Sequence, residues 1–152
     1  MPVIIRGNEA AVVAQGDSAV ARLLTPAIVG NDRIELDHVA VAPGGTYAPD
    51  LADGMVGWLQ VLSGDGALDG TALTDKHIAY LPVGFSGGFR AGGAETRLLV
   101  ARVPNAARFD DGIAGMPSEL RHVDWTREPV LQSEHDARTR VYLATPALAG
   151  TG

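Results

Sequence analysis

Short apolar runs alternate with clusters of glycine, proline and small polar residues along most of this chain. In the clearest run, residues 33–42, two sets of positions alternate with a period of two, and Pro43-Gly44-Gly45 ends the run. This period is typical of a β-strand, whose successive side chains point to opposite faces. Similar runs bounded by turn residues predict further strands at 3–5, 10–13, 19–24, 57–62, 77–81, 96–103 and 140–144. Many short strands with such turns predict an all-β sandwich or closed barrel.

The chain is long enough for one domain, and 46% of its 152 residues are hydrophobic, which is enough for a packed interior. We expect a barrel over residues 1–117 and a C-terminal extension over 118–152. In the extension, 118–124 is expected to form a short helical turn, and 125–140 is a charged segment without apolar periodicity. An unpaired apolar strand at 140–144 needs cover, from the barrel or from a partner subunit, and a homodimer is therefore predicted.

Charge and cysteine content exclude several classes of protein. The net charge of −6, with scattered lysines and arginines, argues against binding to nucleic acid or to anionic membranes. The absence of cysteine excludes disulfides, thiolate nucleophiles and cysteine zinc sites. The first residues lack the features of a signal peptide, and no apolar run approaches the roughly 20 residues needed to span a bilayer. A soluble, cytoplasmic protein is expected.

Two segments resemble the paired motifs of the cupin superfamily. The first runs from Pro43-Gly44-Gly45-Thr46 to Val61-Leu62-Ser63-Gly64-Asp65-Gly66 and is similar to the family's Pro-Gly turn, ligand loop and closing hairpin. The second, Tyr80-Leu81-Pro82-Val83-Gly84-Phe85-Ser86-Gly87, resembles the Pro-x-Gly-x-x-His turn. The resemblance implies a cupin-like β-barrel or jelly roll with a small-molecule pocket at its mouth, similar to the N-terminal half of a two-domain bicupin.

The positions that hold a metal ion in that family carry few donor atoms here. The family's glutamate position falls on Gly57, and the histidine of the second motif falls on Gly87. The two histidines of the first motif fall on Leu51 and Asp53, or on Asp50 and Ala52. Since a transition metal generally needs three or four protein donors, we expect no metal and no other cofactor. Gly57 and Gly87 leave room either for a ligand or for neighbouring side chains.

Two residues are candidates for proton transfer. His38 shares a strand face with Ile34, Leu36 and Ala40, and it is either a core or rim histidine or a general base that points into the barrel. Asp53 either stabilises a turn through its backbone hydrogen bonds or acts as an acid or base among apolar neighbours.

Further residues in or beside the two motifs are candidate ligand contacts. Aromatic side chains there could stack on a planar molecule, and Arg90 could pair with an anionic group, although core packing is the commoner use of phenylalanine. His77 has the same alternatives as His38. Trp58 is expected to point outward, as at a subunit interface. The candidate ligand-binding residues are Tyr47, Asp50, Gly57, His77, Phe85, Gly87, Phe89 and Arg90.

Three functions remain open at this point. The first is a metal-independent isomerase, cyclase or lyase that acts on a small organic molecule. The second is a non-catalytic barrel, either a ligand-binding module or the structural half of a bicupin. The third is a metal-dependent dioxygenase with an atypical site formed by His38, His77 and an aspartate.

Overall fold

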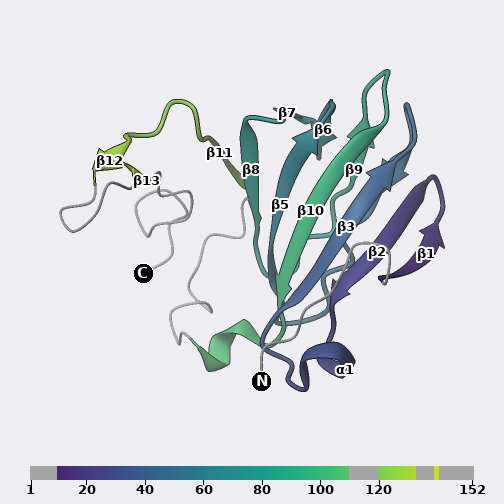
Figure 1. Cartoon of the computed structure of the whole chain (residues 1–152), viewed down its shortest axis with the longest axis vertical. Helices are drawn as coiled ribbons and strands as arrows, with labels where there is room; N and C mark the ends of the chain where they lie inside the picture. The colour runs from purple at the N-terminus through teal and green to yellow at the C-terminus, as the bar shows by residue number, and fades with distance from the viewer. Residues whose placement is uncertain (1–9, 110–119, 133–138, 141–152) are drawn as a thin grey trace.

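The computed structural model describes residues 10–109, 120–132 and 139–140, and the regular secondary structure of these residues consists almost entirely of antiparallel strands (Figure 1). The predicted all-β fold is confirmed. One sheet has seven strands, and its spatial order is β1-β2-β3-β10-β5-β8-β11. Their bounds are β1 Ala11–Gln15, β2 Ser18–Leu24, β3 Glu35–Val41, β10 Thr96–Val103, β5 Val56–Ser63, β8 His77–Leu81 and β11 Arg121–Asp124.

A second sheet of four strands, in the order β4-β9-β6-β7, packs against the first. Its strands are β4 Thr46–Tyr47, β9 Phe89–Ala91, β6 Asp65–Leu68 and β7 Thr71–Thr74. The main core lies between the two sheets, because its buried side chains come from both. Its members are Val20, Val39, Val41, Tyr47, Leu59, Val61, Leu68, Leu73, Ala79, Leu81, Phe89, Ala91, Leu98 and Val100. This arrangement is the cupin-like jelly roll that the two motifs predicted.

Glycines fix two features of the smaller sheet. Asp69 and Gly70 connect β6 to β7 with positive φ angles of 47° and 81°, which a two-residue hairpin turn requires. Gly66 lies directly under Phe89, and a Cβ atom there would collide with the Phe89 ring. The close approach of Gly66 lets Phe89 be fully buried.

The structure shows which of the two alternating sets of β3 side chains faces the second sheet. Val39 and Val41 are fully buried on the inner face together with Asp37, whereas His38 and Ala40 are half-buried on the outer face. His38 pairs with Leu99 of β10, and Leu99 pairs with Gln60 of β5, so that these three side chains lie in one row on the outer face. Of the two alternatives for His38, the general base that points into the barrel therefore does not fit its position on the outer face. Both faces of this strand carry apolar residues, and the pattern alone did not show which face the second sheet covers.

The C-terminal extension begins within the seven-stranded sheet. β11 pairs antiparallel with β8 from Arg121–Tyr80 to Asp124–His77, so the helical turn expected at 118–124 is wrong for residues 121–124. The strands β12 (Leu131–Gln132) and β13 (Thr139–Arg140) have two residues each and pair with one another. The strand expected at 3–5, the strand expected at 140–144 from residue 141 onward, and the domain boundary at 117 lie outside the described residues.

Two short helices complete the described chain. Helix α1 (Pro26–Val29) begins at Thr25, whose side-chain oxygen accepts a hydrogen bond from the Ile28 amide, and η1 (Ala106–Arg108) follows β10. No helix in the described part of the chain combines the length and apolarity that crossing a membrane would require.

Candidate functional site

The two motif loops meet the core between the sheets, where a cupin-like barrel would hold its ligand. Tyr47 is 3% exposed and Phe89 is fully buried, and both belong to the main core. Phe85 and Leu51 are partly buried and pack against it. Three of the four predicted aromatic and cationic ligand contacts, Tyr47, Phe85 and Phe89, are thus brought together, but as members of a packed interior.

The two glycines at the family's ligand positions leave little free space. A Cβ atom on Gly57 would lie 3.0 Å from the Ala101 carbonyl oxygen and 3.4 Å from side-chain carbons of both Leu51 and Leu81. A Cβ atom on Gly87 would lie 2.6 Å from the Phe85 ring. Of the two alternatives left by the sequence, neighbouring side chains rather than a ligand occupy the volume beside these glycines.

Three predicted site residues lie at the surface instead. Asp50 and Asp53 are exposed in the loop between β4 and β5, and Asp50 has a φ angle of +53°. Arg90 is exposed because it alternates with the buried Phe89 and Ala91 on β9. These positions do not place a carboxylate or a guanidinium inside the barrel.

The two predicted histidines are far apart in the fold. His38 lies on the outer face of the seven-stranded sheet. His77 begins β8, and its Nδ1 accepts a hydrogen bond from the Thr74 amide at 3.1 Å. Its ring centroid lies 5.9 Å from that of His122 on β11. The structure therefore does not assemble His38, His77 and an aspartate into one site.

Inside the barrel the structure reveals a charged network that the sequence did not indicate. Arg102 of β10 is buried, and its Nη2 binds Asp37 Oδ2 at 2.5 Å while its Nε binds Glu35 Oε2 at 3.2 Å. Its Nη1 donates to the Pro49 carbonyl oxygen at 3.0 Å, which fastens the loop between β4 and β5. Arg22 of β2, which is 38% exposed, reaches Asp37 Oδ2 at 3.3 Å. Two arginines and two carboxylates thus neutralise one another on the inner face.

The parity of β3 and β10 contained the available signal for this network. Glu35 and Asp37 share a face of β3 with Val39 and Val41, and Arg102 shares a face of β10 with Leu98 and Val100. Charged residues in step with aliphatic ones indicate a buried ion pair only once the strands are known to be neighbours. That pairing, with Arg102 opposite Glu35, comes from the fold.

The network and its surroundings shift two pKa values. Burial raises the pKa of Tyr47 to about 12, and the negative charge of Asp37 adds to the effect while Arg102 opposes it. Tyr47 therefore stays a neutral phenol in the ordinary pH range. Burial lowers the pKa of Arg102, but Asp37, Tyr47 and Glu35 outweigh it, so the net shift is upward and the guanidinium remains charged.

One carboxylate oxygen of the network has no partner in the described chain. Asp37 is 1% exposed, its Oδ2 accepts from both arginines, and its Oδ1 is buried without a hydrogen-bond donor among the described residues. A buried carboxylate oxygen normally binds a donor, from protein, water or ligand. This oxygen is therefore the position in the interior best suited to receive an O–H or N–H group.

The donor set does not fit a metal ion of the kind that the cupin resemblance implies. Gly57 and Gly87 supply no side-chain donor, and apolar atoms of Leu51, Leu81 and Phe85 surround them. Among the residues that the structure describes, no three histidines or carboxylates lie close enough together to hold one. The carboxylates of the interior are engaged by arginines instead.

Fold and site together define a cupin-like barrel whose interior carries an arginine–carboxylate network, with Arg102 directly opposite Gly57 of β5. The solved structures that resemble it are cupin-fold proteins. One is the protein from Pseudomonas aeruginosa whose name calls it glyoxylate-induced, with a TM-score of 0.64 and 19% identity over 81% of this chain and 48% of that one. This chain thus spans about half the length of that relative.

Two shorter proteins are also similar. The polyketide cyclase RemF from Streptomyces resistomycificus has a TM-score of 0.57 and 19% identity, covering 69% of this chain and 80% of that chain. Ectoine synthase from P. lautus has a TM-score of 0.56 and 15% identity, covering 72% and 86%. At such low sequence identities, these similarities establish the shared fold alone. No family model matches the sequence, and no curated protein matches it significantly.

Proposed function

We propose that this barrel binds a small organic molecule without the help of a metal, through a hydrogen-bond donor placed against Asp37 Oδ1. The observation that carries the proposal is this buried carboxylate oxygen beside two arginines, which has no hydrogen-bond donor in the part of the chain that the structure describes. A ligand hydroxyl or amine would supply the missing donor, and the Tyr47 hydroxyl, kept protonated by burial, lies near the same network.

The fold supports this proposal because cupin-like barrels enclose their ligands between the two sheets, and two of the similar structures are named as enzymes of small molecules. Isomerase, cyclase or lyase chemistry stays a prediction for this site. His38 cannot serve it from the outer face, and Asp53 lies in an exposed loop. A non-catalytic binding module needs no general base and agrees better with an aspartate that two arginines hold.

Mass spectrometry of the small molecules that co-purify with the protein tests the proposal. We expect wild type to retain a molecule that Asp37→Asn loses, because an amide keeps one acceptor for Arg102 but offers an N–H group where the ligand needs an oxygen. Arg22→Gln, which leaves the Arg102–Asp37 pair in place, should reduce retention. His38→Ala on the outer face is the control and should retain the same molecule as wild type.

The proposal fails if folded Asp37→Asn and Arg22→Gln proteins retain the same molecules as wild type in the same amounts. Circular dichroism melts of each variant establish that the comparison is made between folded proteins. Homodimer formation, also predicted from the sequence, is measured separately by light scattering after size exclusion, and a monomer at all concentrations would contradict it.

A further inference from the structure

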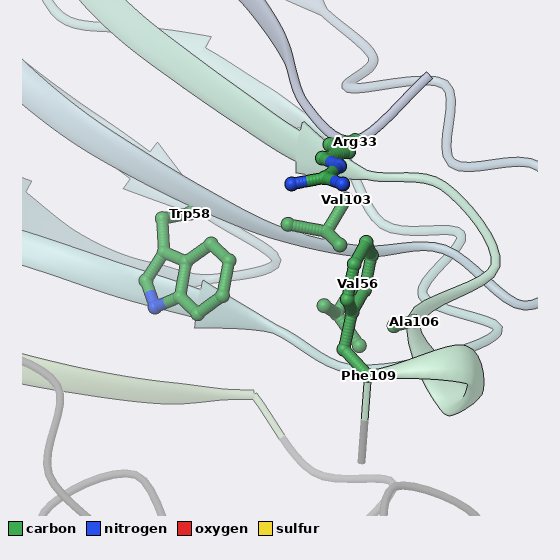
Figure 2. Close-up of a pocket in the computed structure, with 6 residues that line it drawn as sticks. All are labelled: Arg33, Val56, Trp58, Val103, Ala106 and Phe109. Carbon is green, nitrogen blue, oxygen red and sulfur yellow. The ribbon is translucent and has the colours of Figure 1, made fainter. Parts of the chain in front are cut away.

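The outer face of the seven-stranded sheet carries an apolar groove of about 390 Å³, separate from the barrel interior (Figure 2). It lies where β5 begins and β10 ends, and η1 closes one side of it. Its volume lies in the range of roughly 300–1,000 Å³ that is usual for small-molecule pockets. The residues that line it are Arg33, Val56, Trp58, Val103, Ala106 and Phe109.

The walls of the groove are held by packing. Val56 and Val103 face one another across β5 and β10, and Val56 is 3% exposed. The Trp58 ring meets the Tyr80 ring edge-on, with 5.8 Å between centroids. The Ala106 amide donates to the Gly54 carbonyl oxygen at 2.9 Å, which fixes η1 to the loop before β5. A preformed cavity of this kind binds a ligand without the conformational entropy cost of ordering its walls.

Arg33 is the charged group of the groove. Its guanidinium lies above Val103, between Trp58 and Phe109 (Figure 2). No carboxylate of the described residues lies within ion-pair distance of it. The neighbouring Asp32 is instead engaged by Arg108, at 2.8 Å. A positive charge is thus left at the edge of an apolar cavity, in a chain whose net charge is −6.

We propose that this groove binds a compact apolar carboxylate, such as an aromatic or branched acid. The hydrocarbon part would lie among Trp58, Val103 and Phe109, and the carboxylate would accept two hydrogen bonds from the Arg33 guanidinium. This site is independent of the interior site proposed above, because Trp58 points to the opposite face of β5 from Leu59.

Calorimetric titration with 2-naphthoate and with its neutral counterpart 2-naphthamide tests the inference. The two probes share one ring system, so the difference between them isolates the contribution of the charge. We expect wild type to bind the acid at least about tenfold more tightly than the amide, since a charge-assisted bidentate contact contributes on that order. Arg33→Gln should remove this preference and leave the amide affinity unchanged.

Arg97→Gln is the matched control. Arg97 lies on β10 and shares the outer face with Val103, but it is six residues away, which is about 20 Å along a strand, and it is exposed. It should keep the wild-type preference for the acid. Val103→Phe, which fills the groove with a larger ring, should weaken both probes.

Equal affinities of wild type for the acid and the amide would overturn the inference, and so would a preference that survives Arg33→Gln. Asp37→Asn separates this inference from the proposed function. If the naphthoate affinity is unchanged in that variant, the groove site stands independently of the interior. If Asp37→Asn abolishes naphthoate binding in a folded protein, the probe binds in the interior and the groove proposal is wrong.

Discussion

The two faces of the seven-stranded sheet differ in how they treat charge and space, although the same strands build both. On the inner face, Arg102 and Asp37 are almost completely buried and bind each other, and apolar side chains fill the positions beside Gly57. On the outer face, Trp58 and Val103 line an open apolar groove, and Arg33 beside them has no carboxylate partner in the described chain.

This contrast shows that one arginine can be a structural element and another a recognition element within a few strands of each other. Arg102 binds three protein groups, so most of its hydrogen-bonding capacity serves the fold. Arg33 is exposed, and its guanidinium remains available to a ligand. On the inner face, Asp37 Oδ1 resembles Arg33 in having no partner among the described residues.

The largest expected effect follows from breaking the buried network. Arg102→Met leaves Asp37 and Glu35 without their shared cation, and the free energy of unfolding should fall by about 3–5 kcal/mol. Urea unfolding followed by circular dichroism measures it. Arg97→Met on the exposed outer face of the same strand should change it by no more than about 0.5 kcal/mol. Similar losses in both variants would remove the distinction between the two faces.

Overpacking the inner face should have the next largest effect. Gly57→Leu places a side chain against Leu51, Leu81 and the Ala101 carbonyl oxygen, and the expected loss of unfolding free energy is roughly 2–3 kcal/mol. The double variant Gly57→Leu with Leu51→Ala provides space and should recover part of the loss. A Gly57→Leu protein as stable as wild type would show that the interior has free volume there.

High pH should destabilise the inner face through Tyr47. Because burial raises its pKa from 10.0 to about 12 in the folded protein, the neutral phenol contributes stability that is complete below pH 10 and is lost as the pH rises through about 12. The expected loss is about 2 kcal/mol, relative to Tyr47→Phe, in urea unfolding between pH 9 and pH 12. If the free energy of unfolding has the same pH dependence in wild type and in Tyr47→Phe, the raised pKa of the buried phenol is contradicted.

The smallest effect is expected at His38. Since its side chain lies half-buried on the outer face, His38→Ala should change the free energy of unfolding by about 0.5 kcal/mol. Thermal unfolding at pH 7 measures this change. A loss of several kcal/mol would mean that His38 has a role in packing that its position does not indicate.

Much of the fold follows from local patterns. The strands observed at 35–41, 56–63, 77–81 and 96–103 correspond to the runs expected at 33–42, 57–62, 77–81 and 96–103, because a period of two and flanking turn residues are local signals. β11 was missed because its four residues, Arg-His-Val-Asp, have no apolar periodicity, and pairing with β8 makes them a strand. The spatial order of the strands, with β10 between β3 and β5, is a property of the whole fold.

The candidate site was less predictable than the strands. Tyr47, Phe85 and Phe89 are predicted as ligand contacts with core packing as the alternative, and the structure places Tyr47 and Phe89 in the core and packs Phe85 against it. The motifs give no sign of Arg102, whose partner Asp37 is 65 residues away. The sequence leaves the direction of His38 open because the two faces of its strand have similar apolarity, and the choice between them depends on which face the second sheet covers. Long-range pairings of this kind require the tertiary structure.

The hydrogen bond from Arg102 to the Pro49 carbonyl oxygen also determines how a molecule could enter the barrel. The loop after β4 cannot move away without breaking this hydrogen bond and leaving a donor of the buried Arg102 guanidinium without its acceptor. Opening of the loop should therefore be infrequent. Entry of a ligand past this loop would then be slow and steeply dependent on temperature. It would favour molecules small enough to pass while the loop stays closed. Slow hydrogen exchange at the amides that flank Pro49 would be the signature of such a fixed entrance.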